Sequence, residues 1–170
     1  MTKNKYLRNK MMNFLNKLFS KNNLSEKTEN QIITDFDSLV AIARKSGEID
    51  DLYKLYRKLL ELNNWIFITP NNQKIENSKP FIGVVDENSW VFIFTDSKNA
   101  NDYCKQFEGF IREDRTAFLI KMKVKDSIEM LYQLSERGVF GIRINEGENG
   151  WFCSISDLPN IINHLKVNIE

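Results

Sequence analysis

The stretch FIGVVDENSWVFIFTDSKNANDY, from Phe81 to Tyr103, determines how the rest of the chain is interpreted. Two apolar runs, Phe81–Val85 and Trp90–Phe94, flank four turn-forming residues, Asp86–Ser89, and this pattern predicts a β-hairpin. The second run is apolar at every position instead of alternating, so we expect it to be buried on both faces. The sequence therefore predicts that Trp90–Phe94 is a central strand of a sheet.

The segments on either side of this hairpin predict further helices and strands. Upstream, apolar residues at helical spacing predict helices over residues 26–46 and 50–62, and the β-rich run Trp65–Thr69 predicts a strand. Downstream, the apolar period predicts, in order, a helix capped by Asp96 or Ser97, a strand over residues 117–124, a helix over residues 126–137, strands over residues 139–145 and 151–156, and a final helix near Pro159. The resulting order, α-α-β-β-β-α-β-α-β-β-α, indicates an α+β domain with a mixed β-sheet and helices packed on it.

Two of these elements carry more detailed predictions. The helix before residue 47 is expected to have its N-cap at Ser25 and to end at Gly47, which favours the left-handed conformation of a helix terminus. In the run VFGIRIN, alternation places Phe140, Ile142 and Ile144 on one face of a strand.

Residues 1–24 are predicted to form a basic amphipathic helix, separate from a single domain over residues 25–170. Its apolar stripe consists of Leu7, Met11, Phe14, Leu15 and Leu18. Residues 1–25 hold six basic side chains and no acidic one; the basic residues are Lys3, Lys5, Arg8, Lys10, Lys17 and Lys21. Three roles are compatible with this arm: packing on its own domain or in a homodimer, a solvated tail, or contact with a foreign partner. A foreign partner includes an anionic membrane surface, which it would bind weakly.

The remaining 145 residues are mildly acidic, with 18 basic and 23 acidic side chains. Nucleic-acid binding normally uses a clustered positive face, so we expect no nucleic-acid partner. A net charge of −5 instead suits a basic protein target.

The compartment is predicted from what the chain lacks. Its apolar runs are far shorter than the roughly 18 residues that span a bilayer, and its basic start has no secretory core. Two cysteines, Cys104 and Cys153, are too few for a disulfide scaffold, so we expect both to be buried free thiols in a reducing cytoplasm.

The sequence contains few residues in patterns typical of catalysis or cofactor binding. The chain has one histidine, His164, and no spacing typical of a metal site or a phosphate-binding loop. Its carboxylate pairs fall at expected helix starts, helix faces and turns, where charge is normally solvated: Asp35/Asp37, Asp50/Asp51, Glu113/Asp114 and Glu146/Glu148. We therefore predict that the protein is not an enzyme and needs no cofactor. The alternative is an enzyme of unknown class that uses Cys153 or a carboxylate.

The hairpin and the C-terminal run resemble the N-terminal domain of the SseB family. In that family an apolar strand ends in a Thr/Ser cap, followed by a helix with a small residue that faces the sheet; the matching residues here are Phe94, Thr95, Ser97 and Ala100. The run ERGVFGIRINEGENGWFCSISDLPNII is similar to the family's closing hairpin and helix, with Gly150 and Asp157 at the matching positions. The resemblance covers roughly residues 50–165, without the arm, and the loops differ by being rich in Asn and Lys. It implies a bacterial cytoplasmic domain and supplies no catalytic residues.

These observations predict a non-enzymatic protein-binding or adaptor domain of the SseB type whose partner is another protein. The expected contact residues are Lys5, Arg8, Lys10 and Lys17 in the arm, and Glu146, Glu148 and Trp151 at a loop edge. The loop is favoured because loops on a rigid sheet often carry function. An immunity-type protein that neutralises a cognate toxin is the main alternative, since such proteins also use small acidic domains without catalytic residues.

Overall fold

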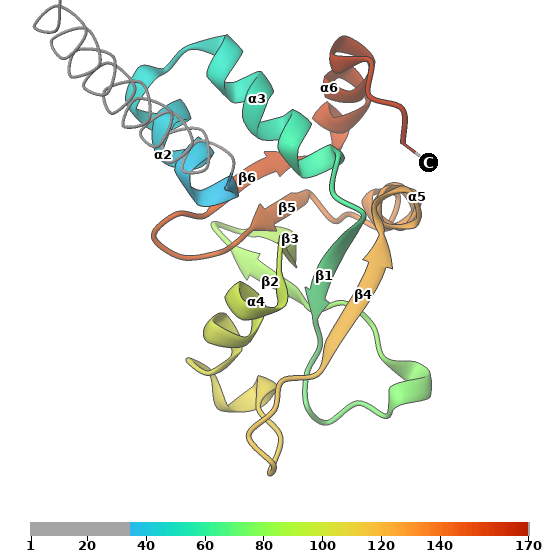
Figure 1. Cartoon of the computed structure of the whole chain (residues 1–170). Coiled ribbons are helices and arrows are strands. Elements are labelled where there is room, and N and C mark those ends of the chain that lie inside the picture. Colours follow the sequence, from blue (N-terminus) through green and yellow to red (C-terminus); the bar gives the residue numbers. More distant parts are fainter. Residues whose placement is uncertain (1–34, 170) are drawn as a thin grey trace, which may run out of the picture.

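The computed structural model describes residues 35–169, which fold as an α+β domain in the predicted order of elements (Figure 1). The helices are α2 (Phe36–Ser46), α3 (Ile49–Leu60), α4 (Ser97–Cys104), α5 (Val124–Ser135) and α6 (Leu158–Leu165). The strands are β1 (Asn64–Ile68), β2 (Ile82–Val85), β3 (Asn88–Phe94), β4 (Leu119–Lys123), β5 (Gly141–Ile144) and β6 (Trp151–Ser154). Over these residues no helix has the length and apolar content required to cross a bilayer. The predicted arm, residues 1–24, lies outside the described residues.

The six strands form one mixed sheet in which β4, β1, β3, β5 and β6 lie in this order. Strand β3 pairs antiparallel with both β1 and β2 along one edge and parallel with β5 along the other. Its residues Trp90–Phe94 are all buried. The prediction of a central strand is therefore confirmed.

Side-chain alternation divides the apolar residues between the two faces of this sheet. One face carries Trp65, Phe67, Val91, Ile93, Ile142 and Ile144, which pack in the main core with buried residues of α2, α3, α5 and α6. Figure 1 shows α2, α3 and α6 together on the same side of β5 and β6. This face is covered along most of its width.

The opposite face is covered at only one end. Ile66, Ile68, Phe92 and Phe94 form a second core with Ala100 and Cys104 of α4 and with Phe110. At the end formed by β5 and β6, Phe152 is 57% exposed, and Phe140, just before β5, is 45% exposed. The sheet therefore presents an open half-face beyond α4.

Helix α2 begins later than predicted. Asp35 has extended backbone angles, and its Oδ1 accepts a hydrogen bond from the Ser38 N–H at 2.8 Å. The prediction of one uninterrupted helix over residues 26–46 is therefore wrong, because Asp35 is an N-cap and not a helical residue. Ser25 lies outside the described residues. The end of the helix is as predicted, with Gly47 at φ 66° and its N–H bonded to the Ala43 carbonyl.

The hairpin turn is shorter than predicted. Val85 pairs with Asn88, so the turn consists of Asp86 and Glu87 alone and not of four residues. Both have positive φ, 49° and 65°, as a type I′ turn requires. Asn88 and Ser89, which have turn-forming character in the sequence, instead begin β3.

Candidate functional site

Four side chains meet on the open half-face of the sheet: Trp90, Phe140, Arg143 and Phe152. We call them the aromatic patch. The rings of Phe140 and Phe152 lie edge-on to Trp90, with centroid distances of 5.0 and 5.8 Å. Trp90 is only 6% exposed, whereas the two phenylalanines are about half exposed. The patch is thus a buried indole flanked by two accessible rings.

One neighbouring glycine, Gly141, makes room for the Trp90 indole, and a second, Gly83, makes room for the rings of Phe92 and Phe81. In the strand register, Gly83 of β2 and Gly141 of β5 lie directly on either side of Trp90. A Cβ at Gly141 would lie 2.5 Å from Cζ3 of the indole and 2.5 Å from the Cys153 carbonyl oxygen. The indole Nε1 donates to the Val85 carbonyl at 3.1 Å. The ring is therefore fixed both by shape and by a hydrogen bond.

Phe140 is not part of the main core, so the prediction that it shares a face with Ile142 and Ile144 is wrong. Strand β5 begins at Gly141, and alternation applies only within the strand. The Phe140 N–H donates to the Ser89 carbonyl at 2.8 Å, and its own carbonyl accepts from the Ile155 N–H at 3.0 Å. These bonds fix the backbone while the ring packs against Trp90 on the opposite face.

Arg143 brings a fixed positive charge to the patch. Its Nε and Nη2 donate to the two carboxylate oxygens of Glu146 at 2.6 and 2.9 Å, a bidentate pair. The Glu146 carboxylate, through this hydrogen bonding, raises the pKa of Arg143 above its ordinary value. The guanidinium carbon lies 5.5 Å from the ring centroid of Trp90 and 5.8 Å from that of Phe152, within cation–π range.

The loop after β5 is anchored to two neighbouring elements. Asn145, at φ 47°, accepts from the Thr95 N–H at 2.9 Å and donates to Asp37 Oδ1 of α2 at 3.0 Å. Arg44 of α2 donates to the carbonyl of Glu148 at 2.8 Å and also to that of Gly150. The loop edge predicted from the sequence is therefore held against the first and last turns of α2 and the end of β3.

The predicted contact residues separate in the structure. Glu146 lies beside the patch through its ion pair with Arg143. Glu148 is exposed on the loop, but Trp151 is only partly exposed, packs against the main core and donates to the Tyr56 hydroxyl at 3.2 Å. Phe152, the next residue along β6, is the aromatic side chain that points to the open face. Of the predicted contacts, Lys5, Arg8, Lys10 and Lys17 lie outside the described residues.

The chain's thiols and its histidine do not form a common site. Cys104 and Cys153 are buried and free, as predicted. Burial raises the pKa of the Cys153 thiol to about 12 and that of Cys104 to about 11, so both are protonated at neutral pH. His164 is exposed and stacks on Tyr53, with a centroid distance of 4.2 Å. Over residues 35–169, no group of three His, Cys, Asp or Glu side chains is placed to hold a metal ion.

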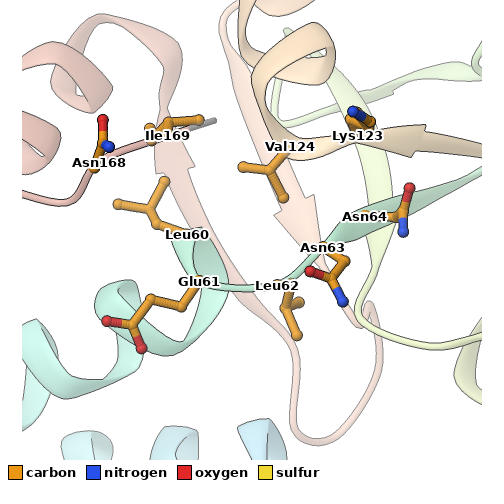
Figure 2. A pocket seen from close by; sticks show the side chains of 9 residues that line it. All are labelled: Leu60, Glu61, Leu62, Asn63, Asn64, Lys123, Val124, Asn168 and Ile169. Atoms are coloured by element: carbon orange, nitrogen blue, oxygen red, sulfur yellow. The ribbon is translucent and has the colours of Figure 1, made fainter.

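A pocket of about 490 Å³ lies where α3 leads into β1, away from the patch. Figure 2 shows Leu60 and Ile169 on one side of it and Val124 on the other, with the Glu61 carboxylate turned away from them. The remaining lining residues are Leu62, Asn63, Asn64, Lys123 and Asn168. This lining offers hydrocarbon, amides, one ammonium and one carboxylate, a set that provides contacts but no nucleophile paired with a base.

The chain matches no protein-family model, and no curated protein shows significant sequence similarity to it. The aromatic patch combines two half-exposed apolar rings with a hydrogen-bonded tryptophan and an ion-paired arginine.

Proposed function

We propose that this chain is a non-enzymatic protein-binding domain, an adaptor of the SseB type, that binds another protein through the aromatic patch and the adjoining loop edge. The observation that carries the proposal is the patch itself: two half-exposed phenylalanines and an arginine fixed around a buried tryptophan. Aromatic residues and arginine are enriched at the centres of protein interfaces, whereas an open sheet face is usually polar.

The rigidity of the patch also supports binding. Association loses conformational entropy when mobile side chains become fixed. Here the Trp90 indole packs against Gly141 and donates a hydrogen bond to the Val85 carbonyl, and Arg143 is held by Glu146 at two points. Little side-chain freedom remains to be lost, so more of the contact energy is available for affinity.

A second candidate function is neutralisation of a toxin by an immunity-type protein. It is favoured by the exposed carboxylates of Asp86 and Glu87 in the β2–β3 turn and of Glu148 in the loop after β5. Acidic side chains next to an apolar patch suit a basic target by electrostatic complementarity. The two functions use the same surface and differ in the partner: a toxin would be encoded in the neighbouring gene, and an isolated locus would exclude this function.

The proposal is tested by removing the ring of Phe152. The full chain and its Phe152→Ser variant are used to capture partners from an extract of the source organism, and each captured protein is then titrated. We expect Phe152→Ser to lower the affinity for a specific partner by at least about tenfold, as loss of an interface anchor does.

Ile49→Ser is the matched control, because Ile49 is an equally exposed apolar residue, 55% exposed, on α3. It should leave binding unchanged. Equal binding by wild type and Phe152→Ser, with both proteins folded, would contradict the proposed surface.

A further inference from the structure

The aromatic patch has an acidic border. Asp86 and Glu87 are exposed in the turn next to it, and the Asp86 charge is close enough to raise the pKa of Arg143 further. Arg143 is the cation of the patch, and Glu146 already neutralises it at 2.6 Å. A ligand that fits this surface therefore needs apolar side chains for the exposed rings and positive charges for the border.

Residues 1–24 of the same chain have this chemistry. They carry five apolar side chains at helical spacing and six cations without a carboxylate. Their charge is opposite to that of the rest of the chain. Among the segments of this protein, this one is complementary to the patch in both respects.

The chain also enters the described structure close to the patch. Asp37, in the first turn of α2, accepts a hydrogen bond at 3.0 Å from Asn145, which adjoins Glu146. From Asn145 back along β5 to Gly141, beside Trp90, is about 13 Å at the rise of a strand. The ten residues 25–34 can span up to roughly 33 Å. The connection is therefore long enough for residues 1–24 to reach any part of the patch.

We propose that residues 1–24 of the chain bind its own aromatic patch. The apolar side chains of the segment, among them Leu7, Phe14 and Leu18, cover Phe140 and Phe152, and its lysines lie toward Asp86 and Glu87. Such a tethered segment acts at an effective concentration in the millimolar range, so a modest intrinsic affinity suffices. A foreign partner then has to displace the segment, which makes the patch a regulated surface. This intramolecular contact does not require that a foreign partner exist.

Hydrogen–deuterium exchange of the full-length chain tests the proposal. Peptides from residues 1–24 are compared between wild type, Phe152→Ser and the control Ile49→Ser. We expect amides of residues 7–18 to exchange at least several-fold faster in Phe152→Ser than in wild type, and Ile49→Ser to match wild type. The variant Lys10→Glu/Lys17→Glu should accelerate exchange in the same peptides, as should added salt. Peptides from β3 report in the same experiment that each variant is folded.

Two results would overturn the proposal. The first is equal exchange of residues 7–18 in wild type and Phe152→Ser, with β3 still protected. The second is protection that disappears on dilution while light scattering shows a dimer, because the segment would then come from a second copy. Neither result bears on partner capture by the patch, which is measured separately, so failure of this inference is distinguishable from failure of the proposed function.

Discussion

At the scale of single residues, Trp90 depends on the absence of a side chain at Gly141. A methyl group there would meet both the indole and the Cys153 carbonyl at 2.5 Å, and the carbonyl belongs to the neighbouring strand and cannot move alone. We predict that Gly141→Ala lowers the free energy of unfolding by about 1–3 kcal/mol, the usual range for overpacking. Chemical denaturation measures this change.

Gly109→Ala is the control for Gly141→Ala. A Cβ at Gly109 has no atom within 4 Å, and its φ is not positive. This variant should change the free energy of unfolding by less than about 0.5 kcal/mol. If Gly141→Ala were as stable as Gly109→Ala, the proposed role of the glycine in positioning Trp90 would be wrong.

The Cys153 thiol makes stability depend on alkaline pH. Burial raises its pKa from 9.0 to about 12. Below pH 9 the thiol is protonated in both states; above it the unfolded chain loses the proton while the folded chain keeps it. The free energy of unfolding should therefore fall with rising pH, by up to about 1.4 kcal/mol per pH unit from this group.

Denaturation of wild type and Cys153→Ala at several values between pH 8 and pH 11 checks this prediction. Cys153→Ala also removes contacts in the main core, so the slopes of the free energy of unfolding against pH are compared instead of its absolute values. Cys153→Ala should show a shallower decline above pH 9. Identical slopes in the two proteins would show that the thiol titrates normally in the folded state.

At the scale of elements, the β2–β3 turn contains two residues whose side chains disfavour the backbone conformation that they adopt. Asp86 and Glu87 both have positive φ, which costs a residue with a side chain more than it costs glycine. We predict that Glu87→Gly raises the free energy of unfolding by about 0.5–1 kcal/mol, partly offset by the greater freedom of glycine in the unfolded chain. The midpoint of thermal unfolding measures the effect.

Glu113→Gly gives the comparison for the turn. Glu113 is also exposed and lies in a turn, but it is not among the positive-φ residues of the described chain. Glycine there should leave stability unchanged or lower it. A gain of equal size in both variants would mean that backbone conformation at Glu87 is not the cause.

The sequence predicts helices and strands correctly where burial sets the spacing of their apolar residues. The uninterrupted apolar run of β3 indicated a central strand, because only a strand covered on both faces tolerates such a run. The predicted boundaries of elements are wrong where polar residues end an element without changing the spacing of its apolar residues. Asp35 ends the helical period by capping α2, and the pairing of Val85 with Asn88 shortens the turn. Neither event changes the apolar period, so the period could not reveal it.

At the scale of the whole molecule, the candidate site was only partly predictable. The loop pattern indicates Glu146, which lies beside the patch, and Trp151, but the exposed ring belongs to the neighbouring Phe152. Strand alternation predicts that the side chains of Trp151 and Phe152 point to opposite faces of the sheet. Only the packing of the helices determines which face stays open. Arg143 was missed for the same reason: between the buried Ile142 and Ile144 it had to face the other side, but the sequence does not show what that side meets.

The Arg143–Glu146 pair allows stability and recognition to be separated in the intact protein. Arg143→Glu alone places two carboxylates together in partly buried positions, with side chains only 19% and 25% exposed in the wild-type pair. We predict a loss of about 1–2 kcal/mol in the free energy of unfolding, from the lost charged hydrogen bonds and the new repulsion. The double variant Arg143→Glu/Glu146→Arg restores an ion pair of opposite orientation and should recover most of that loss.

Recognition should respond differently to the same double variant. The exchange removes the guanidinium from the position 5.5 Å from Trp90 and 5.8 Å from Phe152, and puts a carboxylate beside the rings instead. A carboxylate is repelled by the electron-rich faces of the rings that attract a guanidinium. We therefore expect Arg143→Glu to weaken partner capture. The double variant should bind the partner equally weakly, although denaturation shows restored stability. Binding that returned together with stability would mean that the pair only supports the fold, and that the partner does not contact the cation of the aromatic patch.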